Sequence, residues 1–230
     1  MKSGIIVFAR LNSMRLPGKA LIKIAGIRLI DRVLNRVQKA EGASITVVAT
    51  TDTNLDDQLV EYLEGRDVYI YRGSGSDVAL RAACCAKFHN LDCFVRISGD
   101  SPFINSDLIT RALLKYKTGS FDLVTNVFPR TFPRGVSVEV IKTQAIQRLL
   151  ELTQQEFYTE HVTPYFYDNP DKFSIKNIFS NNVAFREANL AVDTPTDLKR
   201  INWILETFGE GLDLSSLAEK SNLWNSEQCD

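Results

Sequence analysis

Short apolar segments alternate with amphipathic segments through the first half of this chain, and this alternation restricts the fold more than any other feature. The apolar segments are continuous, as buried parallel strands are; they cover residues 4–8, 44–50, 68–71 and 93–97. The helical period of apolar residues predicts helices over 29–40, 56–64, 77–87 and 106–116, the last with Ser106 as its N-cap. This order predicts an α/β fold with a doubly wound, mostly parallel sheet.

The second half of the chain is more mixed. Strands are predicted over residues 123–127, 136–141 and 174–178, and helices over 143–152 and 196–208. Residues 157–166 fit a short helix or a loop, and the polar tail 222–230 is expected to fray. Because no linker or repeat interrupts the chain, we expect one domain over residues 1–230. Residues of about 130–180 are expected to form a small β-rich lid or dimerisation insertion.

Composition excludes several classes of protein. The formal net charge is −1, which gives no reason to expect a nucleic acid or a membrane as partner. No apolar run approaches the ~18 residues that span a bilayer, and Arg10 interrupts the first apolar stretch too early for a signal peptide. Two histidines and no Cys-x-x-Cys pair argue against a zinc site. We expect unpaired thiols in the cytoplasm, with Cys84, Cys85 and Cys93 in the core.

Polar clusters follow each of the four predicted strands of the first half. They are residues 10–19, 50–52, 72–77 and 98–100. The carboxyl ends of parallel strands meet at one edge of an open sheet, where ligands bind. The sequence therefore predicts one site that these four loops share.

The first of these loops, residues 9–19, has the composition of a polyphosphate site. Arg10, Arg15 and Lys19 can neutralise phosphate charge, and Ser13 with the turn amides can hydrogen-bond phosphate oxygens. It is not a Walker A loop, because Ser13 stands where the first Gly belongs and Ala20 follows Lys19. The alternative is a basic surface loop that binds nothing.

Two aspartates end predicted strands and are candidate metal ligands. Asp100 follows Gly99, and Asp193 precedes a predicted helix. Mg²⁺ prefers one or two carboxylates together with phosphate oxygens, so this pair suits it. Either residue can instead be a turn or capping aspartate. Thr194 is expected to cap the helix with Pro195 at its first position, and Asp197 to lie in its first turn.

Several segments, in order along residues 4–200, resemble nucleotidyltransferases that make activated sugars. The loop 9–19 resembles their pattern Ala-Arg-x-x-Ser-x-Arg-Leu-Pro-Gly-Lys, and it is most similar to the cytidylyltransferases, namely the CMP-Kdo synthetases and the SpsF-like spore-coat polysaccharide proteins. Further matches are Gly99-Asp100, Val192-Asp193-Thr194-Pro195, Pro133-Arg134-Gly135 and Glu160-His161-Val162-Thr163. The resemblance implies a Rossmann-like fold of the nucleotide-diphospho-sugar transferase type.

The resemblance also implies a reaction: Mg²⁺-dependent transfer of CMP from CTP to a small anionic sugar or phosphorylated acceptor, with release of pyrophosphate, by a homodimer in surface polysaccharide synthesis. Arg10, Arg15, Lys19 and Ser13 would hold the phosphates, and Asp100 and Asp193 the metal. Arg10, Arg15, Lys19 and Asp100 would be catalytic. The residues expected around base and ribose are Ala9, Thr50, Arg72, Gly73, Ser74, Arg96 and Ser98. Arg134, Glu139 and His161 would face the acceptor.

The chain departs from the family pattern at some positions, and other functions compete. Thr159 stands where the family has Arg, and Phe8, Asn12 and Ser101 replace other common residues. Arg134 and Glu139 also fit a hairpin with a salt bridge, and His161 a structural histidine. A GT-A-type glycosyltransferase would share the fold, although Ser98 stands where the first acid of its Asp-x-Asp belongs. A degenerate, non-catalytic nucleotide-binding protein is the other alternative.

Overall fold

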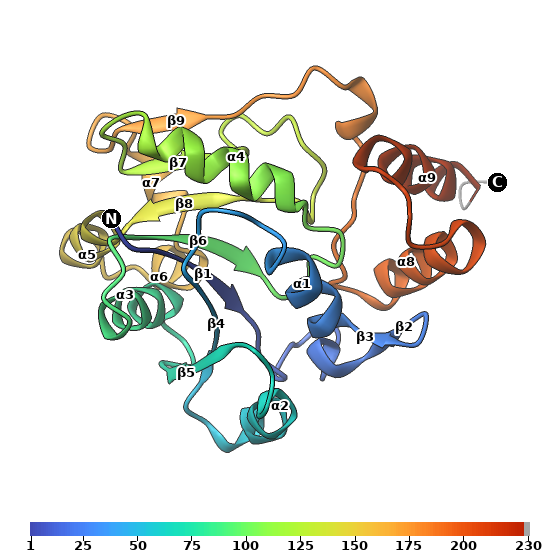
Figure 1. Cartoon of the computed structure of the whole chain (residues 1–230), viewed down its shortest axis with the longest axis horizontal. Coiled ribbons are helices and arrows are strands. Elements are labelled where there is room, and N and C mark those ends of the chain that lie inside the picture. The colour runs from blue at the N-terminus through green and yellow to red at the C-terminus, as the bar shows by residue number, and fades with distance from the viewer. Residues whose placement is uncertain (228–230) are drawn as a thin grey trace.

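The apolar segments of the first half form the parallel part of a seven-stranded sheet with strand order β5-β4-β1-β6-β8-β7-β9. The computed structural model describes residues 1–227 (Figure 1). Strands β5, β4, β1 and β6 are parallel, β8 runs antiparallel to β6 and β7, and β9 is parallel to β7. The strands are β1 (Ser3–Phe8), β4 (Ile45–Thr51), β5 (Tyr69–Gly73), β6 (Cys93–Ser98), β7 (Leu123–Thr125), β8 (Glu139–Lys142) and β9 (Ile175–Asn177).

Helices cover both faces of this sheet, which confirms the doubly wound architecture. One face packs against α1 (Leu29–Val37), α2 (Asp57–Leu63), α4 (Ser106–Lys117), α8 (Pro195–Phe208) and α9 (Leu214–Glu227). The other packs against α3 (Val78–Phe88), α5 (Thr143–Leu152), α6 (Glu156–His161) and α7 (Pro164–Asp168). Successive side chains of β6 alternate between the two cores, since Val95 belongs to one and Phe94 to the other.

Some elements differ from the sequence predictions. Asn105, not Ser106, caps α4, because its side chain accepts a hydrogen bond from the Leu108 N–H at 2.7 Å. Helix α9 continues to Glu227 through most of the predicted fraying tail, where the Asn222 side chain donates to the Ala184 carbonyl at 2.9 Å and the Trp224 ring lies 5.4 Å from that of Trp203. Short elements not predicted are the hairpin β2 (Lys23–Ile24) and β3 (Ile27–Arg28), and the 3-10 turns η1 (Lys19–Leu21), η2 (Asn54–Asp56) and η3 (Val183–Phe185).

The predicted insertion, residues of about 130–180, contributes β8 and β9 to the main sheet and α5, α6 and α7 to one face. The predicted strand at 136–141 begins only at Glu139, and residues 157–166 form parts of two short helices.

Cys85 and Cys93 are buried as expected, whereas Cys84 is exposed, because it lies on the outer side of α3. Cys229 lies outside the described residues.

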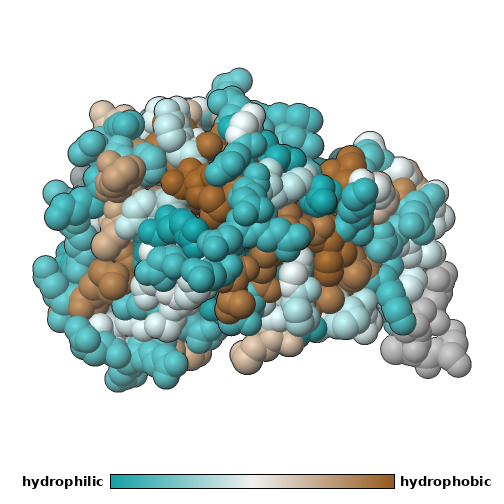
Figure 2. Space-filling model, turned by 90° about the horizontal axis from the view of Figure 1, so that it is seen from below, coloured by the Kyte–Doolittle hydropathy of each residue, from teal (hydrophilic) through white to brown (hydrophobic). Residues whose placement is uncertain are grey.

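Within residues 1–227, no helix is long and apolar enough to span a membrane. On the face shown in Figure 2, hydrophobic side chains form patches separated by hydrophilic ones.

Candidate active site

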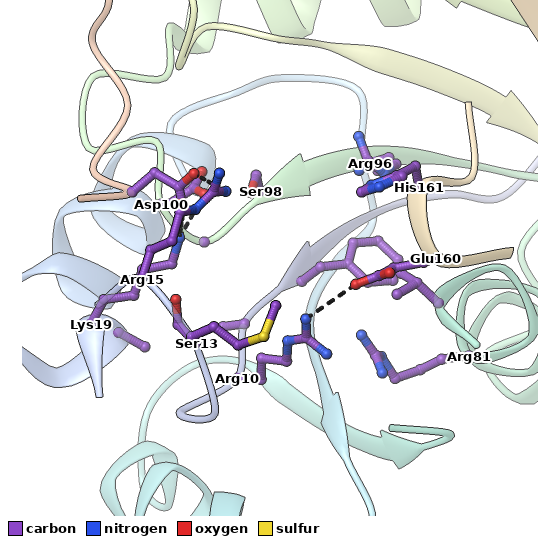
Figure 3. Close-up of a pocket in the computed structure, with 17 residues that line it drawn as sticks. Arg10, Ser13, Arg15, Lys19, Arg81, Arg96, Ser98, Asp100, Glu160 and His161 are labelled. Carbon is purple, nitrogen blue, oxygen red and sulfur yellow. Dashed lines mark hydrogen bonds and ion pairs between the residues drawn. The ribbon is translucent and has the colours of Figure 1, made fainter. Parts of the chain in front are cut away.

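A pocket of about 490 Å³ lies where the parallel strands β1 and β6 end (Figure 3). Most of the predicted site residues meet in it: Ala9, Arg10, Ser13, Arg15, Lys19, Arg96, Ser98, Asp100, His161 and Asp193. The remaining lining residues were not predicted: Phe8, Met14, Ala20, Val78, Arg81, Gly99 and Glu160. The loops after β1 and β6 thus share one site, as the strand order requires.

The carboxylate of Asp56 fixes the start of the first loop. It accepts hydrogen bonds from the Leu11 N–H at 2.6 Å, from the Thr50 hydroxyl at 2.8 Å, and from the Thr51 N–H and hydroxyl. Burial alone would raise the pKa of Asp56, but these hydrogen bonds outweigh it, so the pKa lies below its ordinary value. Asp56 therefore ties the loop after β1 to the end of β4.

Lys19 lies between the two candidate metal ligands. Its Nζ is 2.9 Å from Asp100 Oδ2 and 3.0 Å from Asp193 Oδ1. The guanidinium of Arg15 pairs with the other oxygen of Asp193. Lys19 and Asp193 are 174 positions apart in the sequence, and the fold gathers both aspartates around the Lys19 nitrogen.

Close packing of two loops places Asp100. The Gly99 N–H donates to the Phe8 carbonyl at 2.8 Å, and a Cβ on Gly99 would lie 2.9 Å from both that oxygen and the Ala9 Cβ. A larger residue would push the loop after β6 away from the loop after β1. The Val192 N–H donates to the Asp100 carbonyl at 2.9 Å, which brings the Asp193 segment beside it.

The N-terminus of α8 places Asp193; the residues before it form no strand, contrary to the prediction that Asp193 ends one. The predicted cap is confirmed: Thr194 and Asp197 form a capping box, and Pro195 occupies the first turn. The second oxygen of Asp197 also accepts the Asp193 N–H at 3.1 Å, while the first pairs with Arg200 at 2.5 Å. Burial would raise the pKa of Asp197, but the bonds from Arg200 and Thr194 lower it on balance.

The Asp100–Asp193 pair fits a small divalent cation. Both carboxylates already share one positive charge, that of Lys19. No cluster of three or more His, Cys, Asp or Glu side chains suited to a metal occurs within residues 1–227. The protein would therefore offer two carboxylates and leave the other positions to phosphate oxygens or water, which is the arrangement Mg²⁺ favours.

A second group of charges lies across the pocket from Lys19 and Arg15 (Figure 3). Arg10 reaches Glu160 at 3.5 Å and the Gly75 carbonyl at 3.3 Å. Arg81 is 3% exposed and forms no ion pair with any residue that the structure describes; its Nη1 donates to the Ser74 carbonyl, and its Nε has no hydrogen-bond partner. Burial, together with the nearby Arg10, lowers the pKa of Arg81. A buried guanidinium without a carboxylate partner is costly, so Arg81 marks a place for a ligand.

The residues missed in this group had only weak signals in the sequence. Arg81 interrupts the buried, small-residue face of α3, and that mismatch is a usable clue. Glu160 belongs to the matched Glu-His-Val-Thr segment, of which only His161 was predicted to contact a ligand. His161 is exposed at the pocket. Thr159 donates to the Glu156 carbonyl of its own helix.

Four residues expected around the base and ribose do not line the pocket. Thr50 is fully buried and binds Asp56, and Arg72 pairs with Asp57 at 2.7 Å. Gly73 ends β5, and the Ser74 hydroxyl accepts the Asp77 N–H in the following turn. Strand β5 is the edge strand, two strands from β1, so these polar groups serve the local turns.

Two residues expected at the acceptor also lie outside the pocket lining. Glu139 is 2% exposed and pairs with Arg96 at 2.6 Å, so it supports a pocket residue from behind. Arg134 is exposed in a turn whose backbone bonds to Ala188 and Leu190. The turn glycine, Gly135, has a φ of +84° and leaves no room for a Cβ against Leu190 and Ala191, so the Pro-Arg-Gly match reflects packing.

Comparison with known proteins gives consistent results. A family model described as cytidylyltransferase matches residues 4–221. The spore coat polysaccharide biosynthesis protein SpsF of Bacillus subtilis is 28% identical over 222 residues, which cover 92% of this chain and 89% of that protein. The 3-deoxy-manno-octulosonate cytidylyltransferase 2 of Hydrogenovibrio crunogenus is 28% identical over 181 residues, 77% of this chain and 73% of that one. A cytidylyltransferase structure from Leptospira borgpetersenii superposes with a TM-score of 0.86 at 28% identity, covering 100% of this chain and 96% of that chain.

Proposed function

This chain belongs to the cytidylyltransferase family and is a CTP-dependent nucleotidyltransferase. From that premise we propose that it transfers CMP from CTP to a small anionic acceptor and releases pyrophosphate. The acceptor is a sugar acid or a phosphorylated compound. The observation that carries the proposal is the meeting of Lys19 and Arg15 with the carboxylates of Asp100 and Asp193 at the carboxyl ends of the strands.

The first loop binds the leaving group in this proposal. Arg15 and Lys19 hold the β- and γ-phosphates, Arg10 adds charge from the other side, and Ser13 donates a hydrogen bond. Lys19 and Arg15 exchange carboxylate partners for phosphate oxygens when the nucleotide enters. Such fixed cations lower the barrier by stabilising the charge that develops on pyrophosphate.

Asp100 and Asp193 would hold Mg²⁺ beside the α-phosphate. When bound there, the ion supplies charge neutralisation and lowers the pKa of the acceptor hydroxyl. The acceptor oxygen forms a bond to the α-phosphorus, and the bond from that phosphorus to the bridging oxygen breaks. Pyrophosphate leaves with the electron pair; a hydroxyl acceptor releases its proton to solvent, whereas a phosphate acceptor attacks as an anion and has no proton to release.

The nucleoside would occupy the side of Arg10 and Arg81. Phe8, Ala9 and Val78 give this part of the pocket an apolar lining. The N–H groups of Arg81 that Ser74 does not use would donate to the O2 and N3 acceptors of cytosine. We expect a homodimer in the cytoplasm that serves surface polysaccharide or glycoconjugate synthesis.

Calorimetry with CTP, UTP, ATP and GTP in the presence of Mg²⁺ tests the proposal. We expect selective CTP binding that is weakened in Asp100→Ala and Lys19→Ala, followed by pyrophosphate release with the right acceptor. Preference for another triphosphate would change the product class. No triphosphate binding at all would refute the mechanism and favour a glycosyltransferase or a non-catalytic protein.

A further inference from the structure

A row of polar residues crosses three strands on the face of the sheet that α3, α5, α6 and α7 cover. Arg96 on β6 is the register neighbour of Glu139 on β8, which is the neighbour of Thr125 on β7. Each strand carries a fully buried apolar residue on the same face, two positions along the strand and further from the pocket. These residues are Phe94, Ile141 and Leu123. The face therefore changes from apolar to polar where it reaches the pocket.

The polar row is fully connected by hydrogen bonds. Arg96 Nη1 donates to Glu139 Oε2 at 2.6 Å, and the Tyr167 hydroxyl donates to Glu139 Oε1 at 2.5 Å. The Thr125 hydroxyl lies 3.0 Å from the Tyr167 hydroxyl. Burial, and then the charge of Glu139, raises the pKa of Tyr167 far above its ordinary range, so this hydroxyl remains a donor. Both oxygens of Glu139 are occupied, and Arg96 is held in one orientation.

Stability alone does not explain this arrangement. A buried ion pair costs desolvation, and apolar residues of similar volume are often as stable or more so. Arg96 uses one nitrogen for Glu139, and its buried Nε has no hydrogen-bond partner within the described chain. Since Arg96 also lines the pocket and its side chain is 23% exposed, the terminal nitrogen that Glu139 leaves free is presented to whatever the pocket binds.

The direction from which the acceptor attacks the α-phosphorus indicates which substrate Arg96 binds. In phosphoryl transfer the attacking and leaving oxygens lie roughly in line across the phosphorus. With pyrophosphate at Arg15 and Lys19, the acceptor must approach from the opposite side. Figure 3 shows Arg96 and His161 on that side, away from Arg15 and Lys19, with Ser98 between.

We propose that Arg96 binds the anionic group of the acceptor, a carboxylate or a phosphate, and that Glu139 and Tyr167 are positioning residues that hold its guanidinium in place. This inference rests on the proposed function and moves Arg96 from the nucleotide to the acceptor. A guanidinium matches two oxygens of either anion in a bidentate pair, which explains why its orientation is fixed from behind.

The test uses protein saturated with Mg²⁺ and a CTP analogue that has a methylene group between the α- and β-phosphorus. Two probes are titrated into this complex: 3-deoxy-manno-octulosonate, a carboxylate, and glycerol 3-phosphate, a phosphate. We expect at least one to bind, and its affinity to fall at least about tenfold in Arg96→Gln. Tyr167→Phe should weaken the probe severalfold, while both variants bind the CTP analogue within about twofold of the parent.

Other results would overturn the inference. If Arg96→Gln weakens the CTP analogue as much as the probe, Arg96 serves the nucleotide. If the loaded parent protein binds neither probe, the anion site does not exist. If Tyr167→Phe only lowers the melting temperature, the hydroxyl is structural and has no positioning role. Failure of the parent protein to bind the CTP analogue would instead refute the proposed function, on which this inference depends.

Discussion

At the scale of single residues, Lys19 decides the charge balance of the site. Its ammonium is shared by Asp100 and Asp193, and its side chain is only 16% exposed. Two carboxylates this close would repel each other without a cation between them. Lys19 therefore stabilises the pair of carboxylates and competes for them with a metal ion.

Lys19→Met should have opposite effects on two ligands. CTP should bind at least about tenfold more weakly, because a charged phosphate contact is lost. Mn²⁺ alone should bind more tightly, because the competing ammonium is gone. Calorimetry with CTP and spin-resonance titration with Mn²⁺ measure both, with the exposed Lys23→Met as control. Weaker Mn²⁺ binding in Lys19→Met would contradict this account.

Asp56 is the residue whose ionisation holds the first loop. Its pKa is lowered in the folded protein, so its contribution to stability is present above the unfolded-state pKa of ~3.9 and is lost as the pH falls through the folded value. Asp56→Asn should lower the free energy of unfolding at pH 7 by about 1–3 kcal/mol.

Urea unfolding of Asp56→Asn and the parent protein from pH 7 to pH 3 checks this. The difference in unfolding free energy between the two proteins should be constant at neutral pH and shrink below about pH 4. The exposed Asp52→Asn, whose carboxylate accepts no hydrogen bond from the described residues, is the matched control. A difference in unfolding free energy that grows as the pH falls would contradict the lowered pKa of Asp56.

At the scale of elements, the start of α8 links helix capping to metal binding. Asp197 caps the helix, pairs with Arg200 and fixes the backbone of Asp193. Asp197→Ala should cost about 3–5 kcal/mol, since it leaves Arg200 buried without its partner. It should also weaken Mg²⁺-dependent CTP binding.

The control for Asp197→Ala is Thr194→Ser, which keeps the capping hydroxyl and should change stability by less than about 1 kcal/mol. Thermal unfolding and CTP calorimetry measure both properties. Unchanged CTP affinity in a folded Asp197→Ala protein would show that the helix cap does not influence binding at the site.

The sequence predicted elements best where one physical signal dominated. Continuous apolar runs located β1, β4, β5 and β6 within one or two residues of their ends. It failed for the cap of α4, where Asn105 and Ser106 are equally suitable residues, and for β8, where residues 136–138 precede the strand. Helix α9 was missed because its polar composition hides the few buried positions that hold it.

At the scale of the whole molecule, the C-terminal helix connects to the active site through side chains. The Ser221 hydroxyl donates to the Asn189 carbonyl at 3.0 Å and accepts the Asn189 N–H at 3.1 Å. The Asn189 side chain in turn donates to Asp197 at 3.2 Å. Helix α9 thus supports the segment that carries Asp193.

Ser221→Ala removes both bonds from a fully buried position and should destabilise the protein by about 1–3 kcal/mol. Ser226→Ala, at an exposed position of the same helix, should be close to neutral. Thermal unfolding of both variants checks this. Equal effects of the two changes would show that α9 contributes only through its apolar side chains.

The pocket concentrates positive charge in a molecule whose net charge is −1. Five cationic and three acidic side chains line it. CTP binding should therefore weaken severalfold between about 0.05 M and 0.5 M salt, as screening shortens the reach of these charges. Cytidine, which carries no phosphate, should show no such dependence. Equal salt dependence of CTP and cytidine would argue against a phosphate role for these cations.

The sequence by itself determined the layered α/β architecture, because short buried strands and amphipathic helices each have a local period. It also located the cationic loop and Asp100, because strand order brings carboxyl ends together, and Asp193, because it adjoins the Thr-Pro signal that starts a helix. Only the tertiary structure decided that Glu139 lies behind Arg96, that Thr50 and Arg72 face away from the pocket, and that Arg81 lines it. Which side of a strand or helix faces a ligand depends on packing between segments distant in the chain, and no local period encodes that.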